Sequence, residues 1–385
     1  SKIIVDDPLA IGGTQTSKSI RNEIEAWESD IKYYENYLYD TKLIVGKYYK
    51  IVDDKIVSDD SELTDDTKLA LKTLLWDKLS NSGMADTKEF QDAVSDWAQL
   101  LNQPIPNIKR LSLDIEVESE IGRIPDPKLA EKKVTAVGFE GSDGLKKILV
   151  LRREGIQDGE NDLDPKIELR FFDSEKELIE ETFDLVEEYP VLLTYNGDGF
   201  DLPYLYNRAN RLGVSKSKNP FYMMRDSATL QRGVHLDLYR TFSNRAFQIY
   251  AFGQKYTDFS LNSVCKGILG EEKIDHDEEI GDMTYYKLAK YCQNDARLTY
   301  KLTSFNNDLL MNLLIVITRI ARMPIDDIAR MGVSQWIRSL MYYEHRKNNL
   351  LIPRRIELDN KSIGVANDAV IKDKKYRGGM VVEPI

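Results

Sequence analysis

Apolar and polar positions alternate or cluster in short runs through the middle of the chain. Five such runs predict strands: Ile108–Val117, Val134–Phe139, Lys147–Leu151, Ile167–Phe172 and Val191–Thr194. The first four follow one another directly, and helix and strand alternate afterwards. This order predicts an α/β fold, a mixed sheet with helices on its faces.

Segments with the helical spacing of apolar residues lie before, between and after these strands in the sequence. Ser174 and Glu177 have the spacing of a capping box, which predicts a helix to Glu188. A second helix is expected over about Leu202–Leu212, and helical spacing is almost continuous over Thr284–Asn349. Nearer the start, helices are expected over Ile20–Tyr39 and Thr67–Leu79, with an acidic, turn-rich stretch Asp53–Asp66 between them.

The segment Asn102–Asn107 has two prolines in three positions, which is typical of a boundary between domains. The 385 residues suit two or three domains. The chain begins without Met and ends in a strand-like run after Tyr376, so we expect it to be part of a longer protein.

The amino-acid composition limits which membrane, metal and nucleic-acid functions we expect. No stretch of about 18 residues is apolar and uncharged, so we expect no membrane span. Two cysteines and three histidines exclude a disulfide framework and make a zinc centre improbable, so a cytoplasmic protein that binds metal through oxygen is expected. The net charge of −11 argues against non-specific coating of nucleic acid.

The run Leu111–Glu118 alternates apolar and polar residues. In a strand, Asp114 and Glu116 share a face and lie about 6.6 to 7 Å apart, so their carboxylates can converge on one cation. An amphipathic strand with a solvated acidic face is the alternative. A central strand is covered on both faces, however, and buried carboxylates repel each other unless a cation neutralises them.

Two further segments offer acidic groups. Asp201 lies in Thr194–Pro203, where a predicted strand gives way to a helix, a usual place for ligand sites; its alternative role is a helix N-cap before Pro203. The glycines of this segment do not form a phosphate-binding pattern. Tyr291 and Asp295 lie four residues apart on one helical face, and their alternative is an ordinary half-buried tyrosine with a surface aspartate.

Together, Asp114, Glu116, Asp201 and Asp295 resemble in order and spacing the acidic residues of DEDD exonucleases, and Tyr291 makes the pattern similar to the DEDDy type. The resemblance extends to family B DNA polymerases of the archaeal, particularly crenarchaeal, kind. It is carried by the segments Leu113–Glu116, Tyr195–Tyr204, His235–Tyr239, Tyr291–Asp295, Ile320–Pro353 and Tyr376–Gly379.

The resemblance implies a ribonuclease H-like exonuclease domain over 106–316. A partial α+β N-terminal domain over 1–105 would precede it, and a helical linker over 317–385 would lead toward the polymerase half. That half's carboxylates are not in this chain, and the first segment lacks the opening strands of the family's N-terminal domain. Archaeal members sense uracil with that domain, and we assign no residue to such a pocket.

The implied activity is 3′–5′ proofreading hydrolysis of DNA with two Mg²⁺ ions about 3.5 to 4 Å apart, or Mn²⁺ as a substitute. Asp114 would bridge the ions, Glu116 and Asp295 would complete the first, and Asp201 would hold the second through water. Tyr291 and Glu116 would orient the attacking water, while Asn196 and Phe200 contact the terminal nucleotide. Expected partners are DNA, the remainder of the polymerase and a sliding clamp.

Two other functions remain open. One is a non-catalytic module that binds template or a replication partner, and the other is a separate exonuclease acting on RNA. The basic stretch Arg319–Arg355, with eight Lys or Arg and three Asp or Glu, is either a track for the DNA backbone or a solvated helical face.

Overall fold

The computed structural model describes residues 5, 7, 9–12, 19–24, 27–28, 31–59, 65–66, 69–70, 73, 87–119, 124–274 and 278–352. It divides into two units, one formed by residues 1–43 and 338–385 and the other by residues 44–337. The predicted connector Tyr376–Gly379 lies outside the described residues. No helix within the described ranges has both the length and the apolar character needed to cross a bilayer.

The larger unit is built on a six-stranded sheet in the order β10-β7-β3-β4-β5-β6. β3–β4 and β4–β5 are antiparallel, and the other neighbours are parallel. This confirms the predicted mixed sheet. The strands are β3 (Arg110–Val117), β4 (Val134–Gly141), β5 (Lys146–Leu151), β6 (Glu168–Phe172), β7 (Val191–Thr194) and β10 (Val234–Asp237).

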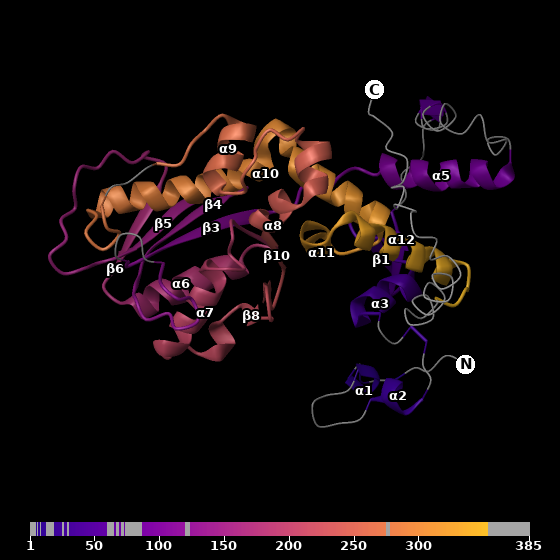
Figure 1. Cartoon of the computed structure of the whole chain (residues 1–385), viewed down its shortest axis with the longest axis horizontal. Coiled ribbons are helices and arrows are strands. Elements are labelled where there is room, and N and C mark those ends of the chain that lie inside the picture. Colours follow the sequence, from indigo (N-terminus) through magenta and orange to yellow (C-terminus); the bar gives the residue numbers. More distant parts are fainter. Residues whose placement is uncertain are drawn as a thin grey trace, which may run out of the picture. The chain divides into compact units, whose positions relative to one another are not determined.

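Helices cover both faces of this sheet (Figure 1). On one face lie α6 (Glu175–Glu187) and α7 (Asp201–Arg211), and on the other the long α10 (Tyr285–Ala321) and α9 (Leu261–Leu269). Further elements that follow α7 in this unit are η2 (Lys216–Lys218), the β8–β9 hairpin (Phe221–Met223 and Ala228–Leu230), α8 (Leu238–Ser243), the π-helix η3 (Phe247–Ala251) and α11 (Ile325–Arg330).

The alternation of β3 divides the core between these two layers. Leu111, Leu113 and Ile115 are buried in the cluster that includes residues of α6 and α7. The opposite face carries Ser112, whose hydroxyl donates to the backbone oxygen of Ala296 on α10 at 2.7 Å. The predicted polar face of β3 therefore lies under α10.

Ser174 begins α6 as expected, but its side chain makes no capping hydrogen bond. The carboxylate of Glu175 accepts instead from the backbone of Val134 at 2.8 Å and pairs with Arg208 at 2.7 Å. The predicted capping box is therefore wrong, because this first turn is tied to the sheet and to α7 rather than capped locally.

The sequence before the sheet differs more from expectation. The larger unit holds a hairpin, β1 (Tyr49–Val52) and β2 (Lys55–Ser58), and α5 (Lys88–Asn102). Asp53 and Asp54 both have positive φ, as a tight two-residue hairpin turn requires, so part of the stretch predicted as turn is strand. The predicted helix Thr67–Leu79 lies mostly outside the described residues, of which 69, 70 and 73 are helical.

The smaller unit contains α1 (Leu9–Gly12), α2 (Ile20–Glu23), α3 (Tyr33–Thr41) and the end of α12 (Val333–Lys347). A single helix over Ile20–Tyr39 was the wrong prediction, because Ile24 and Lys32 have extended backbones that end one helix and precede the next. The Arg346 guanidinium pairs with Glu28 at 2.6 Å and Asp40 at 2.9 Å. These pairs join segments far apart in sequence within this unit.

Candidate active site

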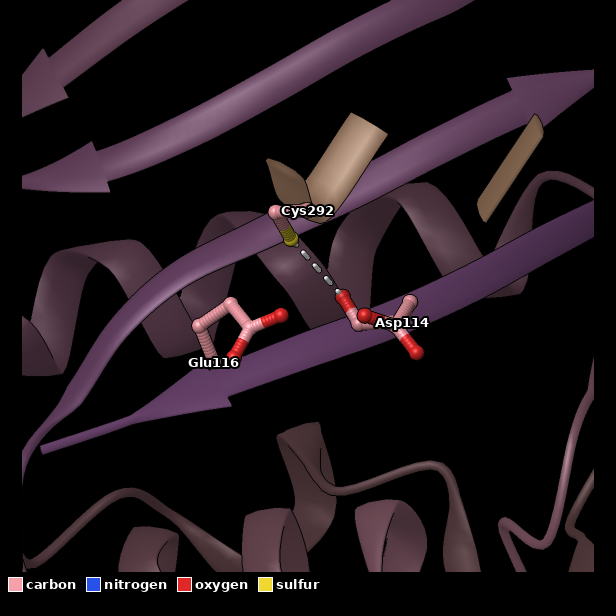
Figure 2. A group of neighbouring side chains, drawn as sticks. All are labelled: Asp114, Glu116 and Cys292. Atoms are coloured by element: carbon pink, nitrogen blue, oxygen red, sulfur yellow. Dashed lines mark hydrogen bonds between the residues drawn. The ribbon is translucent and has the colours of Figure 1, made fainter. Parts of the chain in front are cut away.

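The site begins on β3, which is central in the sheet. Carboxylate oxygens of Asp114 and Glu116 and the sulfur of Cys292 lie within 4.8 Å of one another. Figure 2 shows the two acidic side chains on one strand and Cys292 beside them, where its thiol donates to the backbone oxygen of Asp114 at 3.5 Å. The strand and α10 therefore supply the two sides of one small acidic cluster.

Asp201 reaches this cluster from the opposite layer. It is the first residue of α7, and the N-cap position belongs to Phe200, so the alternative of an N-cap role for Asp201 does not hold. Its Oδ1 accepts the backbone N–H of Ile115 at 3.2 Å, and the residue is only 6% exposed. That bond places the Asp201 carboxylate beside β3 at Ile115, the residue between Asp114 and Glu116.

Asp295 and Tyr291 come from α10 with the predicted spacing of one helical turn. Asp295 is buried, and its Oδ2 lies 2.5 Å from the ammonium nitrogen of Lys273. That same nitrogen lies 5.6 Å from the centre of the Tyr291 ring. Lys273 therefore brings a positive charge to the helix side of the cluster.

Electrostatics show that these groups share one environment. Burial raises the pKa of Asp114 well above its usual range, and the charges of Asp295, Glu116 and Asp201 raise it further. Burial and Asp295 also raise the pKa of Glu116, although Lys273 opposes them. Burial raises the pKa of Asp201 to about 7, against the hydrogen bond from Ile115. Four carboxylates thus carry more negative charge than the adjacent lysine offsets.

The fit of a divalent cation follows from this donor set. Carboxylate oxygens are hard ligands that suit Mg²⁺ or Mn²⁺. Burial first and the neighbouring carboxylates second raise the pKa values of Asp114 and Glu116, so their ionised forms would be stabilised by added positive charge. Lys273 supplies some of it, and its own pKa is raised because the carboxylates of Asp295 and Asp114 outweigh the effect of burial. The residues present therefore fit a divalent metal.

The loop before α7 carries the two residues expected to touch a nucleotide. Asn196 is exposed and has a left-handed backbone (φ 68°), and Phe200 is half-buried with its ring centre 5.4 Å from that of Tyr204. A Cβ at Gly197 would lie 2.1 Å from the Thr194 hydroxyl, so this turn closes only with glycine there. Both residues adjoin Asp201 along the chain rather than entering the carboxylate cluster.

Three polar residues of the site were not found from the sequence. Lys273 lies in an irregular stretch beside two glutamates, and no pattern separates it from a surface lysine. Asp198 is part of the quoted segment, but its spacing does not show that its carboxylate is 1% exposed. Asp237 ends β10, and its side chain accepts the backbone N–H groups of Asn196 at 2.8 Å and Asp198 at 3.1 Å. Only the fold brings Lys273 to Asp295 and Asp237 to the loop that contains Asp198.

Residues 24–264 match the family model described as DNA polymerase family B, exonuclease domain. This match covers more than half of the chain and contains Asp114, Glu116 and Asp201. The chain belongs to this family. It therefore represents an exonuclease domain of family B DNA polymerases, as the resemblance in the sequence implied.

Among similar curated proteins, DNA polymerase 1 of Sulfolobus acidocaldarius is 40% identical over this whole chain, and DNA polymerase 1 of Aeropyrum pernix is 36% identical. The chain spans 42% and 39% of those two proteins. The family B DNA polymerase of Pyrobaculum calidifontis has a similar fold, with a TM-score of 0.53 and 18% identity over 86% of this chain and 37% of that one.

Proposed function

We propose that this chain is a 3′–5′ exonuclease that proofreads DNA by removing one nucleotide at a time from a 3′ end. The observation that carries this proposal is the approach of four carboxylates from three elements in a buried pocket, where Asp295, Glu116 and Asp201 add to the effect of burial in raising the pKa of Asp114. Such a cluster is costly to bury unless it binds cations. Family membership makes a nuclease the class of enzyme to test.

Asp114, Glu116, Asp201 and Asp295 would hold two Mg²⁺ ions, with Mn²⁺ as a substitute. We assign Asp114 as the shared ligand, Glu116 and Asp295 to one ion, and Asp201 to the other. When bound, the ions would supply positive charge to the phosphate and lower the pKa of water. The ion pair of Asp295 with Lys273 would hold that carboxylate in place on the helix side.

The protein's own groups would then orient the reactants. Tyr291 has a raised pKa, because burial and the nearby carboxylates disfavour its anion, so its hydroxyl stays protonated and can donate a hydrogen bond to water or phosphate. Glu116 would accept a hydrogen bond from the attacking water. Water adds to phosphorus, the bond from phosphorus to the 3′ oxygen breaks, and the products are a new 3′ hydroxyl and a nucleoside 5′-monophosphate.

Substrate preference would follow from the loop before α7. Phe200 would stack on the terminal base and Asn196 would contact the terminal nucleotide, and a base–aromatic contact is worth roughly 1 to 3 kcal/mol. A mismatched end frays more often than a paired end and so enters more readily. This preference would direct cleavage to errors.

We further propose that residues 1–105, 106–316 and 317–385 are the N-terminal, exonuclease and linker regions of a cytoplasmic replicative polymerase. The partners would be primer–template DNA, the remainder of the polymerase and a sliding clamp. The assignment to a longer polymerase rests on the relatives, which are DNA polymerases of which this chain spans about two-fifths. The first boundary follows the proline-containing segment Asn102–Asn107.

The first test compares Asp114→Ala and Asp295→Ala with the unmodified chain on a 3′-labelled single strand. We expect Mg²⁺-dependent release of mononucleotides from the parent and none from either variant, because each loses a carboxylate of the cluster. Glu118→Gln is the matched control, since Glu118 lies two residues beyond Glu116 and outside the close group. Undiminished release from Asp114→Ala would refute the assignment.

The same assay separates the two other functions. A non-catalytic module would bind the strand and release nothing even from the parent chain. An exonuclease specific for RNA would release ribonucleotides faster when DNA and RNA strands compete. We expect DNA to be the better substrate.

A further inference from the structure

The carboxylate of Asp198 is an enclosed charge near the proposed site that the mechanism does not use. Its side chain is 1% exposed, and it lies in the loop between β7 and α7, three residues before Asp201. Its Oδ1 accepts the backbone N–H of Ala228 at 2.8 Å. A buried anion needs further partners, and these identify what holds the loop.

Arg330, the last residue of α11, provides the main partner. Its Nη2 lies 3.2 Å from Oδ1 of Asp198 and its Nε 3.3 Å from Oδ2, so the guanidinium binds both oxygens. It also donates to the backbone oxygens of His235 at 3.2 Å and Ala228 at 3.4 Å. One side chain therefore joins the loop to two strands.

The charges around Asp198 support this pairing. Burial alone would raise its pKa, but His235 and Arg330 hold it well below its usual range. The Nδ1 of His235 lies 3.5 Å from Oδ1, and the Nε of the more exposed Arg240 lies 3.7 Å from Oδ2. Asp198 is therefore ionised inside the fold, and Arg330 is the positive group that meets both of its oxygens.

The loop is also held from its other side. Asp237 accepts the backbone N–H groups of Asn196 and Asp198, and it caps α8 by accepting the N–H of Tyr239 at 3.0 Å. Its contacts fix the loop backbone, whereas Arg330 fixes the Asp198 side chain. Phe200 follows as the N-cap of α7, and Asp201, the first residue of that helix, reaches the carboxylate cluster.

We propose that Arg330 is a positioning residue for cleavage, acting through Asp198 on the loop that presents Asn196, Phe200 and Asp201. The proposal rests on the exonuclease function proposed above. In this proposal a side chain of α11, which follows α10, holds the loop that leads to Asp201. Cleavage would then depend on the correct seating of a helix that contains no residue of the carboxylate cluster.

The test uses Arg330→Gln and Arg330→Lys in the full chain. We expect Arg330→Gln to lower kcat about 10- to 100-fold and to raise the Mg²⁺ concentration for half-maximal rate, the usual range for residues that orient metal ligands. The KM for the strand should change less, and Arg330→Lys should recover part of the rate. Arg152→Gln is the matched control, because Arg152 is about half exposed and pairs with Asp173 on the surface.

Amide hydrogen exchange gives a readout that does not need activity. Residues 195–204 should exchange faster in Arg330→Gln than in the parent, while the strands of the central sheet keep their protection. If the parent chain releases no mononucleotide, the proposed function fails, but this measurement still decides whether Arg330 holds the loop. Unchanged exchange in this loop would overturn the proposal.

If Arg330→Gln folds poorly because it leaves the buried Asp198 carboxylate unpaired, a double variant that also removes that charge keeps the proposal testable. Because Arg330 is argued to act through Asp198, Asp198→Asn with Arg330→Gln should lose little more activity than Asp198→Asn alone. Multiplied losses would show two independent roles and overturn it. Losses of kcat that merely follow a lowered melting temperature, with the Mg²⁺ dependence unchanged, would also contradict it.

Discussion

At the scale of single residues, Tyr291 differs from the four carboxylates because it need not bind a cation. Its raised pKa keeps the phenol neutral at ordinary pH, so its contribution is a donated hydrogen bond. Such a bond to a charged group is worth about 1.5 to 3 kcal/mol. Its loss should therefore slow the reaction without removing the cation site.

We predict that Tyr291→Phe lowers kcat about 10- to 100-fold and leaves the Mg²⁺ dependence unchanged. Single-turnover release from a labelled strand measures the rate, and Mg²⁺ titration measures the dependence. Tyr300→Phe on the same helix is the control and should match the parent. A loss as complete as that of Asp114→Ala would show that Tyr291 has a larger role than hydrogen bonding.

The acidic residues could be proposed from the sequence because most of them lie in local patterns, and because these patterns together resemble those of a known family. Asp114 and Glu116 follow from strand alternation, and Asp295 and Tyr291 from helical spacing. Lys273 and Arg330 follow from neither, since each meets its partner across a large sequence separation. Their roles depend on how the elements pack, and no pattern within one element contains that information.

At the scale of elements, five of the six strands of the sheet were predicted nearly to their ends, and most of these carry runs of buried apolar residues. The sixth strand, β10, was not among the predicted runs, because its residues were quoted only for the family resemblance. The helical run after Thr284 was also predicted, but α10 has non-helical backbone at residues 305–308, including three residues with positive φ. The β1–β2 hairpin was missed because its strands are largely exposed and lack a buried alternating face. Local sequence thus predicts buried elements better than exposed ones.

The packing of α10 on β4 is tight at Gly138, which pairs with Asp114 across the sheet. A Cβ there would lie 2.8 Å from the backbone oxygen and 3.1 Å from the sulfur of Cys292. An added methyl group must push the helix away from the sheet. Tyr291 and Asp295 lie on the same helix and would move with it.

We therefore predict that Gly138→Ala lowers the free energy of unfolding by about 1 to 3 kcal/mol, as overpacking does. It should also reduce exonuclease rate at temperatures where the variant remains folded. Urea unfolding and strand cleavage measure the two effects. Gly332→Ala is the control, since a Cβ at Gly332 meets nothing within 4 Å; equal behaviour of the two variants would mean that α10 can shift freely.

At the scale of the whole molecule, the interpretation of the basic stretch Arg319–Arg355 changes. Arg319 is fully buried and donates to backbone oxygens of Gly46, Gln103 and Pro104. Arg330 is engaged with Asp198, and Arg346 pairs with Glu28 and Asp40. These three arginines stabilise the protein's own segments, so the count of basic residues overstates what DNA could meet.

The excess of negative charge in the carboxylate pocket also couples stability to pH and metal. Asp114, Glu116 and Asp201 have raised pKa values when folded, so the native state keeps protons that the unfolded chain has released above about pH 4. For Asp201 this difference covers the window from about pH 4 to its folded pKa of about 7. Stability then falls as pH rises through this window, because the unfolded state binds fewer protons. A divalent cation replaces those protons and should restore what is lost.

We predict that the melting temperature in chelator is lower at pH 8 than at pH 5, and that Mg²⁺ or Mn²⁺ raises it more at pH 8. The gain should increase with cation concentration, as for any ligand that binds only the folded state. Asp114→Asn should show a smaller fall with pH and little gain from the cation, whereas Glu118→Gln should behave like the parent. The difference between these variants isolates the pocket from other carboxylates with raised pKa, such as Asp237. Equal gains at both pH values, or a full gain in Asp114→Asn, would place the cation elsewhere in the molecule.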